Sequence, residues 1–199
     1  GALVGHGTYI WYNNPRAMWA VRLKYKPSDD WQFQYGVFQH NPSLLTNDER
    51  FSFKFSGGLG FMHLAESHWK TAIGPHQLAG NYWLGTYLNT ADYNDVYYDI
   101  NHQSQAVTQD AFYKHSRRQG IYFLFNQQLI RFGNDNRRGL LLLFHTAAND
   151  RKTATVDRQL QIGVRLKGPF ASRPQDDIAF AVARLHVNER RNDHTRERN

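Results

Sequence analysis

The chain contains 199 residues, with 24 Lys and Arg against 17 Asp and Glu, and its formal net charge is +7. It has no cysteine, which excludes a disulfide framework, a zinc–thiolate site and a cysteine nucleophile. The longest apolar run, residues 178–183, is far shorter than the roughly 20 residues of a membrane helix. Aromatic residues make up 15% of the chain and are spread along it, which argues against disorder.

Alternation of apolar and polar residues is the main signal, and it predicts β-strands. In the first clear segment Val21, Leu23 and Tyr25 alternate with Arg22 and Lys24. The predicted strands are 16–26, 31–40, 58–70, 80–91, 119–133, 139–149, 156–167 and 177–188, with 3–12 as a further candidate. Both faces carry apolar residues in 58–70, 119–133 and 139–149, so the sequence leaves the phase of these three open.

The connections between the predicted strands alternate in length. Residues 27–30, 71–79, 134–138 and 168–176 are short and rich in turn-forming residues, whereas 41–57 and 92–118 are long. Residues 150–155 and the tail from residue 189 fall at the long-connection end. Short turns at one end and long loops at the other are typical of an up-and-down meander, and outer-membrane barrels share this asymmetry.

The fold predicted from these patterns is all-β: a transmembrane, antiparallel, up-and-down β-barrel. Several predicted strands reach the roughly 9–11 residues that a tilted strand needs to cross a bilayer, and spanning strands must close into a barrel. Aromatic residues near strand ends lie on the more apolar face, as in the girdles of such barrels. They are Trp19, Tyr25, Trp31, Trp69 and Tyr82. The alternative is a soluble antiparallel sheet with one solvated face.

Several stretches resemble the carbohydrate-selective porins of the OprB type. The resemblance rests on residues 14–25, on Pro-Ser-Asp-Asp-Trp at 27–31, and on 35–43. It continues through 84–87, 90–92, 127–128 and 138–140, and through 168–170, Arg-Pro-Gln-Asp-Asp at 173–177, and 182–188. These stretches cover most of the chain, roughly 14–189, in the family's order.

The resemblance implies a sixteen-stranded outer-membrane barrel of Gram-negative bacteria that passes glucose and related sugars by diffusion. Members of the family are about twice as long as this chain, and eight or nine strands are about half of such a barrel. We therefore expect residues 1–199 to form a single β-barrel domain that is incomplete at both ends. The segment 189–199 is expected to be a truncated loop.

A sugar channel needs a wet lining of hydrogen-bonding side chains that replace the hydration of the solute. Arg and Lys donate to hydroxyl oxygens, Glu accepts from hydroxyls, and Gln does both. The predicted channel-lining residues are Arg22, Lys24, Gln32, Gln34, Glu66, His68, Gln128, Gln159, Gln161, Arg165, Lys167, Arg184 and His186. Phe38, Trp83 and Tyr87 are candidates for stacking on a sugar ring if their phase is inward. The positive charge balance favours anionic solutes modestly.

Other functions have weaker support in the sequence. The ten histidines show no metal-ligand spacing, and no cofactor, catalytic residue or nucleic-acid partner is expected. The basic pairs at 117–118, 137–138 and 151–152 instead suggest contact with outer-membrane lipid and lipopolysaccharide. A soluble carbohydrate-binding module and a self-contained eight-stranded barrel remain as alternatives, as does association of the porin into a homotrimer.

Overall fold

The computed structural model describes residues 19–40, 60–133, 135 and 137–198. Their strands are β1 (Ala20–Tyr25), β2 (Trp31–His40), β3 (Gly60–Ile73), β4 (Leu78–Asn89), β5 (Tyr93–Asp99), β6 (Phe112–His115), β7 (Arg118–Arg131), β8 (Gly139–Asn149), β9 (Val156–Lys167) and β10 (Asp177–Val187). The helices are α1 (Gln105–Thr108) and α2 (Glu189–Arg198). The predicted strand 3–12, residues 16–18 and 58–59 and the predicted loop 41–57 lie outside the described residues.

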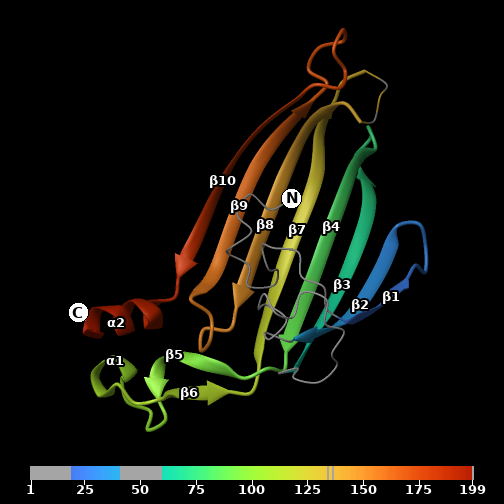
Figure 1. Cartoon of the computed structure of the whole chain (residues 1–199). Helices are drawn as coiled ribbons and strands as arrows, with labels where there is room; N and C mark the ends of the chain where they lie inside the picture. Colours follow the sequence, from blue (N-terminus) through green and yellow to red (C-terminus); the bar gives the residue numbers. More distant parts are fainter. Residues whose placement is uncertain (1–18, 41–59, 134, 136, 199) are drawn as a thin grey trace, which may run out of the picture.

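One antiparallel sheet of eight strands forms the body of the molecule (Figure 1), in the order β1-β2-β3-β4-β7-β8-β9-β10. Each predicted strand that falls in the described residues is confirmed, and each pairs with its neighbour in the predicted meander. In the described part of the chain β1 and β10 are the two edges of the sheet. Within the described residues, these eight strands therefore form an open antiparallel sheet, as the all-β prediction requires.

Cross-strand register separates the sheet into two chemically distinct faces. Residues directly opposite one another on antiparallel strands point to the same side, and one such row runs through Gln34, Glu66, Gly85 and Tyr122. We call the side that carries this row the polar face and the other side the apolar face. The register also fixes the phase of β3, β7 and β8, which alternation alone leaves open.

Burial on this sheet is the reverse of the usual order in a soluble protein. On β9 the side chains of Gln159 and Gln161 are 2% and 6% exposed, whereas Leu160 and Ile162 are each 44% exposed. Apolar side chains on an ordinary antiparallel sheet point toward the core, and polar ones face water. The inverted pattern is typical of a barrel wall with a polar lumen and an apolar outer band.

A continuous row of aromatic rings crosses five strands on the apolar face. Trp31, Trp69, Tyr82, Phe125 and Phe144 stand opposite one another from β2 to β8. Successive ring centroids are 5.9, 5.4, 5.6 and 5.2 Å apart. Such aromatic pairs contribute about 0.5–1.5 kcal/mol each beyond their buried area. The predicted apolar-face position of the first three residues is confirmed, and the row lies toward the short-turn end.

Two segments that the sequence predicts as loops are ordered. Residues 92–118 contain β5, α1 and β6, and the predicted truncated loop 189–199 contains α2. Asn188 caps α2: its side-chain carbonyl accepts from the Arg190 amide at 3.2 Å, and its own amide group donates to the carbonyls of Arg151 and Ala154 at 2.6 and 2.8 Å. No helix in the described part of the chain is long and apolar enough to cross a membrane.

The buried carboxylate of Asp95 joins three of these elements at the long-connection end. It accepts from His115 of β6 at 2.8 Å and from Arg190 of α2 at 2.8 and 3.1 Å. Burial alone would raise the pKa of Asp95, but these contacts and the amides of Tyr97 and Tyr98 lower it below its ordinary value. The ionised form therefore holds α2 against the β5–β6 pair (Figure 1).

Candidate functional site

The centre of the polar face is a hydrogen-bonded group around Glu66. The hydroxyl of Tyr122 donates to one carboxylate oxygen at 2.7 Å, and the amide of Gln34 donates to the other at 3.4 Å. These residues come from β7, β3 and β2, and β4 lies between β3 and β7, so the register of four strands brings them together. The carboxylate keeps lone pairs that can accept from a solute hydroxyl.

Two tyrosine rings lie against glycines of the neighbouring strand. A Cβ atom on Gly85 would be 2.2 Å from Cζ of Tyr122, and one on Gly120 would be 2.4 Å from Cε1 of Tyr87. Each tyrosine therefore covers a glycine on the next strand, which is the way aromatic rings compensate for glycine in a sheet. The hydroxyl of Tyr87 donates to Asn149 at 2.9 Å. The two rings therefore lie flat against the polar face and do not project from it.

A second group lies nearer the short-turn end. The ring of His68 stacks on Trp83 with centroids 4.4 Å apart and an interplanar angle of 9°. Nε2 of His68 donates to the amide oxygen of Asn81 at 3.1 Å, and Gln32 stands opposite His68 in the register. A flat aromatic surface beside hydrogen-bonding groups suits a pyranose ring, which has an apolar face and an equatorial rim of hydroxyls.

The third polar group follows β9. The amide of Gln159 donates to Nδ1 of His145 at 3.3 Å, while its buried Oε1 atom has no hydrogen-bond partner among the described residues. Arg165 forms an ion pair with Asp177 across the pair of strands. A buried acceptor without a protein partner is costly unless water or a solute satisfies it, so this face is built to be wet.

The register places most of the predicted channel-lining residues on the polar face. They are Arg22, Lys24, Gln32, Gln34, Glu66, His68, Gln128, Gln159, Gln161, Arg165 and Lys167. The stacking candidates Phe38, Trp83 and Tyr87 share this face. They share the phase of the predicted lining residues, whereas their inward orientation in a barrel and their contact with a sugar stay predictions.

The register does not place Arg184 and His186 in line with the other predicted lining residues. Arg184 stands opposite Leu160, on the apolar face, and follows Phe180 and Val182 there. His186 stands opposite Arg158 at a bulge, from which its ring reaches Asp157 at 2.6 Å. The prediction was based on the polarity of these two side chains. The side of the sheet on which a residue lies depends instead on its position in the alternation along the strand.

Several polar-face residues were missing from the predicted set, namely Asn81, Gly85, Gly120, Tyr122 and His145. Glycine and tyrosine are not residue types that indicate a channel lining, and their pairing is seen only when the register of the strands is known. The sequence left open which face the residues of β7 and β8 occupy. Among the described residues, His, Asp and Glu side chains form no group of three or more that could hold a metal ion.

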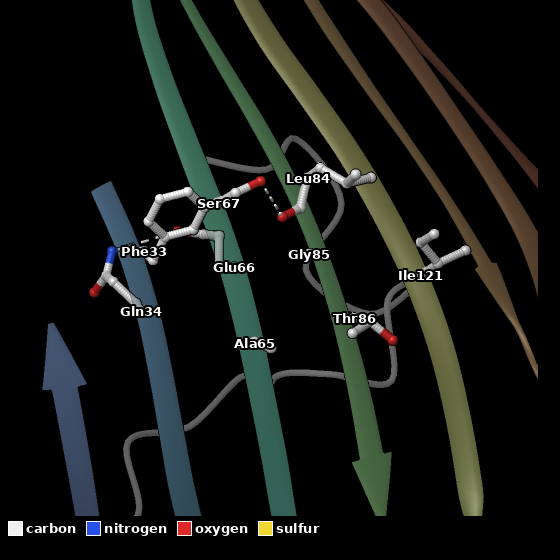
Figure 2. Close-up of a pocket in the computed structure, with 9 residues that line it drawn as sticks. All are labelled: Phe33, Gln34, Ala65, Glu66, Ser67, Leu84, Gly85, Thr86 and Ile121. Atoms are coloured by element: carbon white, nitrogen blue, oxygen red, sulfur yellow. Dashed lines mark hydrogen bonds between the residues drawn. The ribbon is translucent and has the colours of Figure 1, made fainter. Parts of the chain in front are cut away.

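The apolar face carries a shallow hollow of about 370 Å³, shown in Figure 2. Most of its lining residues stand on the apolar face in the register, namely Phe33, Ala65, Ser67, Leu84, Thr86 and Ile121. Gln34, Glu66 and Gly85 of the polar-face row also contribute to the lining. The hydroxyls of Ser67 and Thr86 donate to the carbonyls of Leu84 and Gly120 at 3.3 and 2.9 Å. Both hydroxyls are thus satisfied by backbone, which suits contact with hydrocarbon.

Comparison with known proteins gives consistent family matches. The family described as "Carbohydrate-selective porin, OprB family" matches residues 3–199. The chain is 39% identical over 180 residues to Porin B of Pseudomonas aeruginosa, covering 90% of this chain and 40% of that protein. It is 33% identical over 186 residues to the putative porin QuiX of Acinetobacter baylyi, covering 91% and 39%. The chain thus spans about two fifths of the length of these relatives.

Two solved structures of Pseudomonas putida OprB are also similar. The high-pH structure has a TM-score of 0.89 and 39% sequence identity, covering 95% of this chain and 44% of that one. The low-pH structure has a TM-score of 0.56 and 28% identity, covering 92% and 45%. Because the family match extends over nearly all of the chain and the fold agrees with it, the chain belongs to the OprB family of carbohydrate-selective porins.

Proposed function

We propose that the complete protein is a sixteen-stranded barrel that passes glucose and related sugars by passive diffusion, without catalysis. Membership of the OprB family places the chain in the outer membrane of Gram-negative bacteria. The described sheet would form about half of the barrel wall, with its polar face toward the lumen and its apolar face toward lipid.

The observation that carries this proposal is the inverted burial of the sheet. Amides and charged groups lie on one face, beside a small buried cluster of Leu64, Tyr87, Tyr122 and Ala147, while most of the exposed isoleucine, leucine and phenylalanine side chains occupy the opposite face. A soluble carbohydrate-binding sheet would bury its apolar face instead. A self-contained eight-stranded barrel would have an interior just wide enough to be filled by side chains, which suits so many long polar side chains poorly.

The three polar groups supply what sugar passage needs. Glu66 accepts from hydroxyls, the amides donate and accept, and the Trp83 ring offers an apolar surface. Arg165 is paired with Asp177, so it offers an oriented donor with a partly balanced charge. Weak contacts at several heights help a solute to enter without trapping it.

Sugar flux through variants of the complete protein tests this proposal. We expect Arg22→Ala and Arg165→Ala, both on the polar face, to change the rate of glucose-driven liposome swelling and the single-channel conductance by about twofold or more, because each removes a charged donor from the lining. Arg158→Ala is the matched control, since Arg158 lies on the apolar face of the same sheet.

Two results would contradict the proposal. A complete protein that stays soluble without detergent and opens no channels in planar bilayers is not a porin. Equal swelling rates for the two polar-face variants, the control and the unaltered protein would show that the polar face does not line the sugar path.

A further inference from the structure

Two arginines stand on the apolar face of β9 and β10. Arg158 is opposite His186, and Arg184 is opposite Leu160, so the arginines are diagonal neighbours on one side of the sheet. Diagonal neighbours have Cα atoms roughly 7–8 Å apart, so two long side chains can reach one group. Both side chains are solvent-exposed, Arg158 by 61%.

Within the described residues, one long ion pair is all that balances the positive charge of these two arginines. No ion pair is found for Arg184 among the described residues. The nearest carboxylate to Arg158 is that of Asp157, at 4.0 Å. That carboxylate already contacts Arg151 at 3.0 Å and His186 at 2.6 Å, and Arg151 also holds Glu189 at 3.1 Å. The acidic groups nearby are therefore occupied, and two guanidinium groups remain available.

Apolar side chains continue from this pair along both strands. Ile162 and Val164 follow on β9, and Phe180 and Val182 on β10, each between 39% and 70% exposed. The arginines lie at the long-connection end, where β9 begins after residues 150–155 and β10 ends before α2 (Figure 1). In outer-membrane barrels the long loops are extracellular. The surface thus presents cations above an apolar strip at the outer leaflet.

We propose that Arg158 and Arg184 bind the phosphate of a phosphorylated glycolipid in the outer leaflet, with its acyl chains along Ile162, Val164, Phe180 and Val182. Guanidinium groups match phosphate oxygens with two parallel hydrogen bonds, and arginines near a membrane boundary extend their charged ends to the headgroups. This inference rests on the proposed function only in that the apolar face meets lipid. It also explains why an arginine occurs among apolar residues on β10.

Lipid titration of the complete protein in detergent, followed by native mass spectrometry, tests the site. Diphosphorylated lipid A is the probe, and lipid A without phosphates tests whether the acyl chains alone suffice. We expect Arg158→Gln and Arg184→Gln each to weaken binding of the diphosphorylated form about fivefold, with little effect on the phosphate-free form. Arg173→Gln is the matched control, an exposed arginine in the short turn at the other end.

Further arms separate the possible results. Inorganic phosphate at the same concentration is expected not to displace the lipid, since the apolar strip contributes to binding; displacement by phosphate alone would overturn the lipid site. Equal binding of both lipid forms, or equal loss in the Arg173 control, would also overturn it. Both variants should keep the conductance of the unaltered protein, so loss of this site is distinguishable from failure of the channel itself.

Discussion

Glycines at positions 85 and 120 determine how the tyrosines of the polar face are arranged. Because neither glycine has a Cβ, the rings of Tyr122 and Tyr87 can lie on the backbone of the adjacent strand. A ring in this position presents its hydroxyl along the sheet, and the Tyr122 hydroxyl reaches Glu66 in this way. The glycines thus leave room for both rings against the sheet and for the hydrogen bond from Tyr122 to Glu66.

Replacement of one glycine tests this arrangement. We expect Gly85→Ala to push the Tyr122 ring away from the sheet, to break its hydrogen bond to Glu66, and to cost about 1–3 kcal/mol of stability, as overpacking does. Conductance should fall because the displaced ring occupies lumen. The thermal unfolding temperature and the single-channel conductance measure the two effects.

The double variant Gly85→Ala/Tyr122→Ala is the control for this prediction. It removes the ring that the new methyl group would meet, so its conductance should return to or exceed that of the unaltered protein. Equal loss of conductance in the single and double variants would show that the Tyr122 ring does not block the lumen.

Single residues show what alternation can and cannot predict. The sequence predicts the polar-face position of Gln32 and Gln34 on β2, and of Gln159 and Gln161 on β9. In both strands the glutamines alternate regularly with large apolar residues, so their side of the sheet can be predicted. The prediction for Arg184 gave its charge more weight than its phase, which Phe180 and Val182 set. At a membrane boundary an arginine is compatible with either face, so residue type alone does not decide the side.

Among the elements, helix α2 contains no aliphatic residue and no Phe, Tyr or Trp; its one ring, that of His194, lies beside Phe112 with centroids 5.6 Å apart. Polar contacts hold it instead: Arg190 binds Asp95, His194 donates to Gln105 at 2.7 Å, and Glu197 accepts from Tyr97 at 2.8 Å and from Ser104. A helix held by such groups depends on their protonation, because hydrophobic burial contributes little to its docking.

We expect the docking of α2 to weaken as pH falls. Burial lowers the pKa of His194 below its ordinary value of 6.5, helped by Arg191 and Arg198 against the smaller opposite effect of Glu197. The neutral ring is therefore the docked form, and its contribution is present above pH 6.5 and is lost as the pH falls through the lowered pKa. The lowered pKa of Asp95 adds a second loss below its ordinary value of 3.8.

Hydrogen exchange of residues 189–198 in the complete protein, at pH 7, 5 and 3, measures this loosening as a fall in protection factor, the intrinsic exchange rate at each pH divided by the observed rate. His194→Gln keeps a polar group toward Gln105 but does not titrate, so its protection factors should not change between pH 7 and pH 5 while the step below pH 4 remains. An identical response of the variant and the unaltered protein between pH 7 and pH 5 would contradict the role of His194.

The ordered elements at this end could not be predicted from periodicity. The sequence between β4 and β7 has no sustained alternation, and it is shaped by carboxylates that accept backbone amides, as Asp99 does from Asn101 and Gln103, each at 2.8 Å. The N-cap Asn188 followed by Glu189 was an available helix signal. The contacts that keep α2 in place are long-range and appear only in the structure.

Taken as a whole molecule, the apolar face has different chemistry at its two ends. The row of aromatic rings from Trp31 to Phe144 lies toward the short turns, whereas Arg158 and Arg184 lie toward the long connections. Aromatic residues suit both interfaces of a bilayer, while cations suit the side with anionic headgroups. This asymmetry predicts which end faces the cell exterior.

Cysteine labelling in intact cells tests that orientation. The 199 residues contain no cysteine, so a thiol introduced into this part of the protein is unique there. We expect Lys152→Cys, at the long-connection end, to react with a membrane-impermeant maleimide in intact cells, and Ser28→Cys, in the short turn after β1, to react only after the outer membrane is permeabilised. The reverse pattern would invert the assigned orientation.

The tyrosine rings that cover Gly85 and Gly120 also have a consequence for the electrical behaviour of an open pore. Rings held on the backbone of a paired strand have little freedom to rotate, whereas exposed side chains change rotamer within picoseconds to nanoseconds. The current through this part of the lining should therefore be steady, with little excess noise and no frequent partial closures. Recordings of the Gly85→Ala variant should be noisier, since its displaced ring would move in the ion path.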